Sequence, residues 1–479
     1  MIASAITLLG AVLRLPTLAQ QSYWLDEGYT VRLVRMSLSG MLHAIPRTES
    51  TPPLYYAAAW VWTRGLGDTE FGLRSLSALA GIATVPVAYA IARRLAGLPA
   101  ATIAALLVAV SPLLVWFSQE ARSYALATLL ASISVLCVVG WMQDGRSNWL
   151  AGWAAAAALG LLTHYFVAFI VAPEALLLWR HRSRSDGYLA AASAIVVIVA
   201  LGLIPLALAQ RGTGHSDYIA NGALATRVLQ VPKQMLLGYA SPIQVVTAIL
   251  AAAAVLAGAV WPLTMDRGAR ARARVPLVIG LACVLVPVGL AVVGIDFLDT
   301  RNLLPALPAL YVAAAVGFAA PVTWPRGGAL AGALAVISLL VVVLVDRSPR
   351  FQRDDWRGAE TALGAAAGPR GIIVTPASGI IPLRAYLPGL RALSGPAAVR
   401  ELDVIAIPVQ TTGNGMAVPP RLTTSLPLPA GFHLRRAVYT GTYSALRYTA
   451  PHPVAISPAT LAPDHLGGDA GLVAIQPGR

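Results

Sequence analysis

The chain consists largely of apolar segments that approach or exceed the length needed to cross a lipid bilayer, and this feature most constrains its fold. A helix crosses the hydrocarbon core with about 20 consecutive apolar residues. Only 12% of the 479 residues are charged, against about 25% in soluble domains. We therefore predict a polytopic α-helical membrane protein. The predicted spans are 2–18, 72–92, 99–117, 123–142, 149–165, 166–180, 187–209, 242–264, 275–294, 303–320 and 327–345.

The basic residues predict which loops face the cytoplasm. The net charge is +14, but the arginines cluster in short loops between spans, which is the positive-inside pattern rather than a nucleic-acid-binding one. With the N-terminus inside, every basic cluster between spans except the first loop falls inside. The inside clusters are Arg93-Arg94, Arg146, Arg180 to Arg184, Arg267 to Arg274 and Arg326. We expect a multi-pass protein of the plasma (inner) membrane, and a first span that stays as a signal anchor, with the natural start of the chain left open.

The distribution of apolar runs along the chain predicts two domains. Residues 1–345 would form the transmembrane domain, with a long first extracytoplasmic loop at 19–71 that carries helical patterns near 27–40 and 53–66. Residues 346–479 have shorter apolar runs, and an odd number of spans places them outside as a small α/β or α+β domain without a recognisable catalytic motif. Its predicted strands are 371–376, 401–408, 432–440 and 444–449, and its predicted helices are 355–367 and 378–388.

Several chemistries are disfavoured by what the sequence lacks. Both cysteines, Cys137 and Cys283, fall inside apolar spans, so we expect buried thiols and no disulfide framework or cysteine metal site. No Walker A, GxGxxG or HExxH pattern is present, which argues against an ATP-driven pump and a soluble nucleotide-sugar domain. Few charges lie within the spans, which argues against ion-coupled transport.

Asp26 and Glu27 are the strongest candidates for catalytic residues. They follow the first apolar segment, between Trp24 and Tyr29, and ionisable groups at a membrane edge are functional candidates by default. The structural alternative is an N-cap for the following helix. A cap requires one carboxylate rather than two, so we favour the functional interpretation.

Other candidates lie in the same outside loops. Glu120 is a second acidic group, with Arg122 holding it ionised, although the two could instead form an interfacial ion pair that pins a turn. Arg301 is a candidate clamp for a lipid phosphate, because arginine makes bidentate contacts with phosphate; the alternative is snorkelling to the interface. Arg74 is a weaker candidate of the same kind. Tyr55 lies on an aromatic-rich helix expected at the headgroup level.

Glu49 is a candidate ligand of a divalent metal or a candidate sugar contact, and His164 is its candidate partner. Glu49 precedes a Pro-Pro pair, and His164 ends a predicted span. A single histidine in such a place is more often structural, so we assign no metal and leave a divalent ion as an alternative.

Together these motifs resemble the bacterial membrane glycosyltransferases of the GT-C fold. The similar group is the glycosyltransferase family 39-like one, with protein O-mannosyltransferases and aminoarabinose transferases. The order and spacing fit over roughly the whole chain. The motifs are Trp24-Leu25-Asp26-Glu27-Gly28-Tyr29, Pro52-Pro53-Leu54-Tyr55-Tyr56 with Gly67 to Arg74, Ser118-Gln119-Glu120-Ala121-Arg122-Ser123-Tyr124 with Thr163-His164-Tyr165-Phe166, and Arg301 to Pro308 with Asp354-Asp355-Trp356-Arg357.

The resemblance implies a polyprenyl-phosphate-sugar donor and an inverting transfer on the outer face of the membrane. It implies Asp26 as the catalytic base, with Glu27 beside it, and Arg301, with Arg122, stabilising the departing phosphate. The acceptor would be a lipid, a polysaccharide or a protein. Relatives often carry His or Lys where this chain has Thr51, and Glu49 is shifted by one position from the glutamate that helps to bind zinc in the aminoarabinose transferase.

Three functions remain open at this point. A glycosyltransferase, with mannose as the favoured sugar, fits best. A flippase or transporter for lipid-linked sugars would predict inverted repeats and broken spans, which the sequence does not display. A non-catalytic subunit for envelope assembly would tolerate the loss of Asp26.

Overall fold

The computed structural model describes residues 1–182, 187–215, 217–408, 422, 428–461 and 471–477. The chain forms two compact units, and each is described by itself. The first comprises Met1–Leu18 and Met36–Leu344, and the second comprises Ala19–Arg35 and Val345–Arg479. Residues 19–35, which we expected in the first loop of the membrane domain, therefore group with the C-terminal segment. Arg184 of the predicted basic loops lies outside the described residues.

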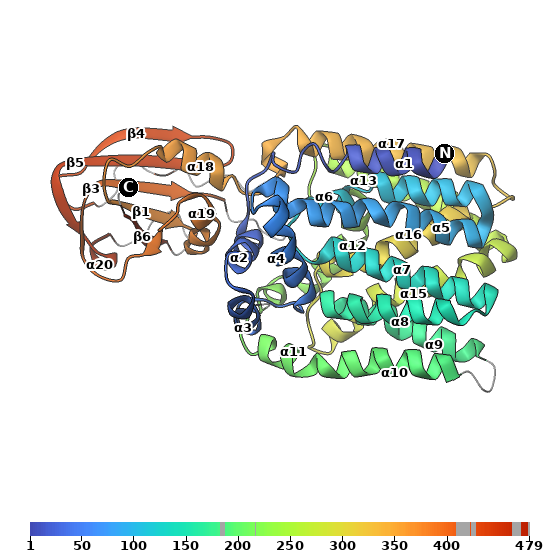
Figure 1. Ribbon diagram of the computed structural model, residues 1–479. Helices are drawn as coiled ribbons and strands as arrows, with labels where there is room; N and C mark the ends of the chain where they lie inside the picture. The colour runs from blue at the N-terminus through green and yellow to red at the C-terminus, as the bar shows by residue number, and fades with distance from the viewer. Residues whose placement is uncertain (183–186, 216, 409–421, 423–427, 462–470, 478–479) are drawn as a thin grey trace. The chain divides into compact units, whose positions relative to one another are not determined.

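The first unit is built almost entirely of helices (Figure 1). They are α1 (Ile2–Val12), α3 (Leu38–Thr48), α4 (Leu54–Leu66), α5 (Glu70–Val110), α6 (Pro112–Ser118), α7 (Tyr124–Asp144), α8 (Ser147–Thr163), α9 (Ala168–His181), α10 (Gly187–Gly202), α11 (Ile204–Arg211), α12 (Leu224–Leu237), α13 (Gln244–Val255), α14 (Trp261–Met265), α15 (Arg267–Val292), α16 (Leu307–Phe318) and α17 (Arg326–Asp346). Short turns of 3₁₀ helix are η1 (Tyr165–Val167), η2 (Asp217–Asn221) and η4 (Thr300–Ala306), and η3 (Leu256–Val260) is a π-helical turn.

Seven helical stretches of the described chain are long and apolar enough to cross a membrane. The longest is α5, whose 41 residues extend about 60 Å at 1.5 Å per residue, roughly twice the thickness of a hydrocarbon core. Its backbone leaves the helical conformation at Ala96 and Gly97, so α5 contains the predicted spans 72–92 and most of 99–117. Helical segments occupy the other predicted spans as well. The protein is thus a mostly helical, multi-pass membrane protein.

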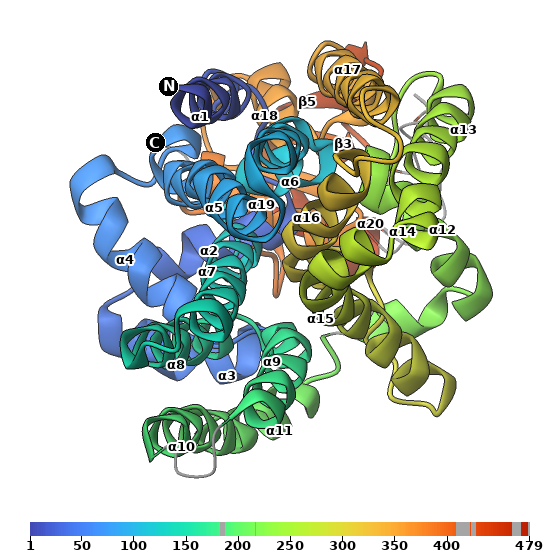
Figure 2. The same ribbon diagram turned by 90° about the vertical axis from the view of Figure 1, so that its right-hand side faces the viewer.

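Small residues allow these helices to pack closely. A Cβ on Gly140 of α7 would lie 2.5 Å from the Trp149 ring of α8, and one on Gly317 of α16 would lie 2.4 Å from the Ala259 carbonyl oxygen. Close approach at small residues is the usual way in which membrane helices gain van der Waals contact. Figure 2, which views the long helices end-on, shows α7, α8 and α9 side by side.

Polar contacts show which loops share an end of the helices. Arg94 near the break of α5 pairs with Asp144 at the end of α7, at 3.2 Å. At the other end, Gln210 of α11 donates to the Thr51 carbonyl oxygen at 3.0 Å, and Figure 1 shows α3, α4 and α11 together there. Both groupings agree with the division of loops predicted from the arginines.

The predicted helical pattern at 27–40 is wrong in its bounds, because the chain leaves the helix there and starts a new one. α2 (Leu25–Val34) ends before Arg35, and Ser37 caps α3 by accepting a hydrogen bond from the Gly40 N–H. A serine at this position satisfies one of the free N–H groups of the first turn. The predicted helix at 53–66 agrees with α4.

The second unit contains a six-stranded mixed sheet in the order β2-β6-β1-β3-β5-β4, with β1 and β3 parallel. The strands are β1 (Arg370–Thr375), β2 (Arg391–Ala392), β3 (Ala397–Ala406), β4 (His433–Tyr439), β5 (Ser444–Ile456) and β6 (Leu472–Gln476). The other elements are α2, η5 (Pro349–Phe351), α18 (Trp356–Leu363), η6 (Ala377–Gly379), α19 (Ile380–Tyr386) and α20 (Pro458–Leu461). The four predicted strands and both predicted helices are present, and β2 and β6 are strands that the sequence pattern did not predict.

A buried aspartate joins three central strands of this sheet. Asp403 of β3 pairs with Arg370 of β1 at 3.2 Å and with Arg447 of β5 at 2.9 Å. Because the carboxylate is fully buried, its charge is compatible with the interior only while both arginines hold it.

Candidate functional site

The predicted site residues of the first unit lie at helix ends. Glu49 follows α3, Tyr55 is in the first turn of α4, and Arg74 is in the first turns of α5. Glu120 and Arg122 lie between α6 and α7, His164 lies between α8 and η1, and Arg301 is in η4. Asp26 and Glu27 lie in α2, which belongs to the second unit.

A buried ion pair between Glu49 and Arg122 forms the centre of the group in the first unit. The Glu49 Oε2 atom accepts hydrogen bonds from Arg122 Nη1 at 2.7 Å and from the Tyr56 hydroxyl at 2.5 Å. The Arg122 guanidinium also lies 5.6 Å from the centre of the Tyr56 ring. From the sequence we expect Arg122 to hold Glu120 ionised; its pair with Glu49 is not among the expected contacts.

Tyr56 acts as a hydrogen-bond donor to this pair. Burial raises the pKa of Tyr56 well above its ordinary value of 10.0, against the opposing effect of Arg122, and the Glu49 carboxylate adds to the rise. The hydroxyl therefore stays protonated at neutral pH and donates its hydrogen to Glu49. Thr51, the residue that departs from the family pattern, lies 2.9 Å from the same hydroxyl.

Residues of other loops hold this group in place. Gln210 donates to the Thr51 carbonyl oxygen, and its own side-chain oxygen accepts from Tyr165 at 2.7 Å. The Tyr55 hydroxyl is 3.2 Å from Ser77, which donates to the Arg122 carbonyl oxygen at 3.3 Å. Tyr55 is therefore a supporting residue, because its hydroxyl is engaged within the protein.

The segment that carries Glu120 is anchored to the end of α1. Glu120 is fully buried. Next to it, Gln119 donates to the Arg14 carbonyl oxygen at 3.1 Å, and the Arg14 guanidinium donates to Ser118 at 3.1 Å and to the Ala109 carbonyl oxygen at 2.8 Å. Arg14 is not among the residues predicted from the sequence, although a charged residue inside an apolar span is a signal that could have identified it.

Arg301 lies near tyrosine rings and pairs with Asp299. Its Nε atom is 3.2 Å from Asp299 Oδ2, and its side chain is 14% exposed. The guanidinium carbon lies 6.0 Å from the centre of the Tyr124 ring and 5.8 Å from that of Tyr218. The Tyr239 hydroxyl donates to Asp299 at 3.3 Å. A guanidinium held in this way at a helix end is suited to binding an anion.

Arg74 and His164 are engaged by the backbone. Arg74 is buried and donates to the Leu18 carbonyl oxygen at 2.8 Å, a contact that fits an anchoring role better than a phosphate clamp. His164 accepts the Phe166 N–H at Nδ1, at 3.2 Å, and its ring centre is 5.4 Å from that of Tyr124. A neutral imidazole that accepts at Nδ1 carries its proton on Nε2.

The residues around Glu49 do not fit a metal site. Within the described ranges, no three His, Cys, Asp or Glu side chains come together in a way that could hold an ion. The Glu49 oxygen nearest to Arg122 accepts from a cation, which disfavours a second cation at the same carboxylate. No step of the proposed chemistry is therefore assigned to a metal.

Asp26 and Glu27 have different environments within the second unit. Glu27 is fully buried, and its carboxylate accepts from the Trp24 N–H at 3.5 Å in a capping-box arrangement, whereas Asp26 is half-buried. The N-cap foreseen as the structural alternative is Trp24, and Glu27 lies in the first turn of α2 and accepts from the N–H of that cap. This difference leaves Asp26 as the better candidate of the two for proton transfer.

α2 is closely packed on α19. A Cβ on Gly28 would lie 2.9 Å from the Pro382 backbone nitrogen, so only glycine permits this approach. The Tyr23 N–H donates to the Tyr386 hydroxyl at 2.6 Å, and Ser22 donates to the Asp354 carbonyl oxygen at 2.6 Å. The Asp354-Asp355-Trp356-Arg357 motif therefore supports the segment that carries Asp26.

The fold is that of a multi-pass membrane protein of the GT-C class. Residues 50–207 match the sequence model of a family described as dolichyl-phosphate-mannose-protein mannosyltransferase. No curated protein sequence matches the chain. The resemblance inferred from the sequence motifs is thus confirmed.

Solved structures of ArnT from Cupriavidus metallidurans are similar to this chain in fold. The apo structure has a TM-score of 0.51 at 16% identity, with 75% of this chain and 68% of ArnT covered. The structure bound to undecaprenyl phosphate has a TM-score of 0.50 at 17% identity, with 68% of this chain covered. This chain spans 61% of ArnT in that alignment. At these identities, the likeness concerns the fold.

Proposed function

We propose that the protein is an inverting glycosyltransferase that moves a sugar, with mannose favoured, from a polyprenyl-phosphate donor to a cell-envelope acceptor. The reaction would take place on the outer face of the plasma membrane, with the C-terminal domain extracytoplasmic. The observation that carries the proposal is the Arg301 guanidinium, which is largely buried at a helix end, beside two tyrosine rings and Asp299. The family match and the fold of ArnT, one structure of which contains undecaprenyl phosphate, support it.

The chemistry assigns a role to each group. Asp26 would act as the base that takes the proton from the acceptor hydroxyl as the oxygen attacks the anomeric carbon. The donor phosphate leaves with negative charge, and Arg301, with Arg122, would stabilise that charge. Glu27 would orient the helix turn that carries Asp26. The donor arrives already activated, so this reaction needs no nucleotide site.

The test is sugar transfer by purified protein in detergent micelles. Radiolabelled polyprenyl-phosphate mannose, and in parallel other polyprenyl-phosphate sugars, are supplied together with an extract of envelope acceptors, for wild type, Asp26→Asn and Arg301→Gln. The control is Asp144→Asn, whose carboxylate pairs with Arg94 in a loop predicted to be cytoplasmic. We expect both site variants to lose about 10²–10⁴-fold in rate, and the control to retain the wild-type rate.

The outcomes separate the alternatives. A flippase forms no product in micelles, where there is no bilayer to cross, so the absence of transfer from any polyprenyl-phosphate sugar would contradict the proposal. A rate for Asp26→Asn equal to that of wild type would exclude Asp26 as the base. Transfer from a polyprenyl-phosphate donor that carries a sugar other than mannose would change the proposed sugar and leave the proposed reaction as it is.

A further inference from the structure

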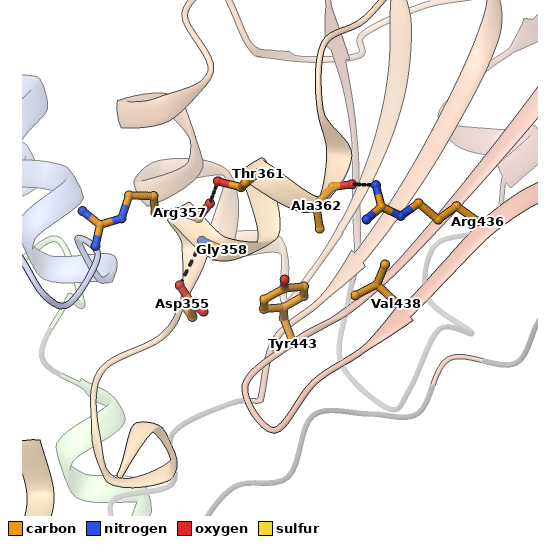
Figure 3. Close-up of a pocket in the computed structure, with 8 residues that line it drawn as sticks. All are labelled: Asp355, Arg357, Gly358, Thr361, Ala362, Arg436, Val438 and Tyr443. Atoms are coloured by element: carbon orange, nitrogen blue, oxygen red, sulfur yellow. Dashed lines mark hydrogen bonds between the residues drawn. The ribbon is translucent and has the colours of Figure 1, made fainter. Parts of the chain in front are cut away.

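The second unit contains a pocket of about 380 Å³ between α18 and the hairpin formed by β4 and β5 (Figure 3). This volume lies within the range of small-ligand sites, roughly 300–1,000 Å³. Apolar groups, an aromatic ring and side chains of both charges line it. Asp355 and Arg357 of this lining belong to the motif that supports the segment carrying Asp26, and the other lining residues have no role in the proposed transfer reaction.

Tyr443 forms the floor of the pocket. Figure 3 shows its ring in the opening, with the hydroxyl directed towards α18. Among the residues that the structure describes, none forms a hydrogen bond with this hydroxyl. Burial raises the pKa of Tyr443, Asp355 adds to the rise and Arg436 opposes it, so opposite charges flank the hydroxyl. Tyr443 therefore offers a ring face and a hydrogen-bonding group to a ligand.

Asp355 and Arg436 supply acceptors and donors around that ring. Asp355 caps α18 by accepting the Gly358 N–H at 2.9 Å, and its other oxygen accepts from Thr442 at 3.3 Å. Each carboxylate oxygen can accept a further hydrogen bond. Arg436 is exposed and donates through Nη1 to the Ala362 carbonyl oxygen at 3.3 Å, which occupies one of its five N–H groups.

Arg436 is the arginine whose guanidinium faces this opening. Arg357 also contributes to the lining, but its guanidinium donates to the Ala19 and Gln20 carbonyl oxygens at 2.9 Å. Figure 3 shows Arg357 directed away from Tyr443. One guanidinium near one carboxylate makes the pocket polar without a strong excess of either charge, which disfavours a ligand that binds by net charge alone.

We propose that this pocket binds a sugar residue of a glycan. A sugar ring has a C–H face that packs on an aromatic ring such as Tyr443, and hydroxyls that donate to a carboxylate and accept from a guanidinium, here Asp355 and Arg436. Val438 supplies a small apolar contact beside the ring. In the proposed reaction, whose correctness this role requires, the bound glycan is the acceptor or a neighbouring part of it. The binding itself does not depend on transfer.

The experiment measures binding without any donor. Full-length protein in lipid nanodiscs is titrated into fluorescently labelled α-mannotriose and α-1,5-arabinotriose, and the fluorescence anisotropy gives Kd. Tyr443→Ala and Arg436→Ala should each raise the Kd about tenfold or more, equivalent to about 1.4 kcal/mol. The matched control is Arg435→Ala, because Arg435 is the neighbouring strand residue and donates to Thr449. It should bind as wild type does.

Three results would overturn the proposal. They are the absence of binding of either trisaccharide to wild type, equal Kd values for wild type and both pocket variants, and competition by inorganic phosphate, which would assign the pocket to anions. Tyr443→Phe guards against misfolding, since it keeps the ring and should retain part of the affinity. Transfer activity does not enter the readout, so failure of the proposed reaction would leave the binding result interpretable.

Discussion

The pair of Glu49 and Arg122 provides a quantitative test of the site in the first unit. Their side chains are only 1% and 9% exposed, and breaking a buried pair by removing one partner costs about 3–5 kcal/mol, since the remaining buried charge loses that partner. Glu49→Gln preserves the shape and one oxygen for Tyr56, so it mainly removes the charge. We expect it to lower the free energy of unfolding by about 3 kcal/mol, and Arg122→Gln to do the same.

The double variant isolates the interaction. Glu49→Gln with Arg122→Gln removes both charges, so its loss should be smaller than the sum of the single losses by about 2–3 kcal/mol. The unfolding of purified protein in mixed micelles, titrated with SDS and followed by tryptophan fluorescence, gives these free energies. The same cycle on Arg94 and Asp144, which are 30% and 33% exposed, should give a coupling below about 1 kcal/mol. Equal couplings for the two pairs would refute the argument from burial.

Three further predictions concern stability. Gly28→Ala should cost about 1–3 kcal/mol through overlap with the α19 backbone, whereas Gly65→Ala, with no atom within 4 Å of the added Cβ, should be neutral or stabilising; thermal unfolding of the two variants separates them. The hydrogen bond from Arg227 lowers the pKa of Asp296 below its ordinary 3.8, so the pair stabilises the fold above that pH and the stabilisation is lost as the pH falls through the lower folded value. Asp296→Asn should therefore unfold with a weaker pH dependence below about pH 4, and an unchanged acid transition would contradict this assignment. Asp403→Asn should destabilise the sheet by about 3–5 kcal/mol, visible as loss of protected strand amides in hydrogen exchange; unchanged protection would show that the buried charge is dispensable.

Hydropathy and arginine placement predicted much of the membrane architecture. Apolar helices must satisfy their backbone groups within the segment, so the positions of α7, α15 and α17 could be read from residue type alone. The sequence predicted two separate spans where α5 has its break, because Arg93 and Arg94 interrupt the apolar pattern there. The strands with regular patterns, β1, β3, β4 and β5, were likewise predictable.

Elements that depend on distant partners were not predictable. β6 has only five residues and is defined by its antiparallel pairing with β1, about 100 residues earlier in the chain. The helix predicted at 27–40 was divided by the local cap at Ser37. The grouping of 19–35 with the C-terminal segment depends on the close packing at Gly28, which leaves no local periodic signal.

The sequence by itself determined which charged residues stand next to the apolar spans. These residues include the candidate site residues Asp26, Glu49, Arg122 and Arg301. Charge in an apolar chain is costly and therefore conspicuous. Only the structure decided the partners: Arg122 pairs with a carboxylate 73 residues away, and Glu27 accepts a hydrogen bond from Trp24, the N-cap of α2. Which charges meet depends on how the loops converge at the helix ends, and the spacing of residues along the chain does not encode that convergence.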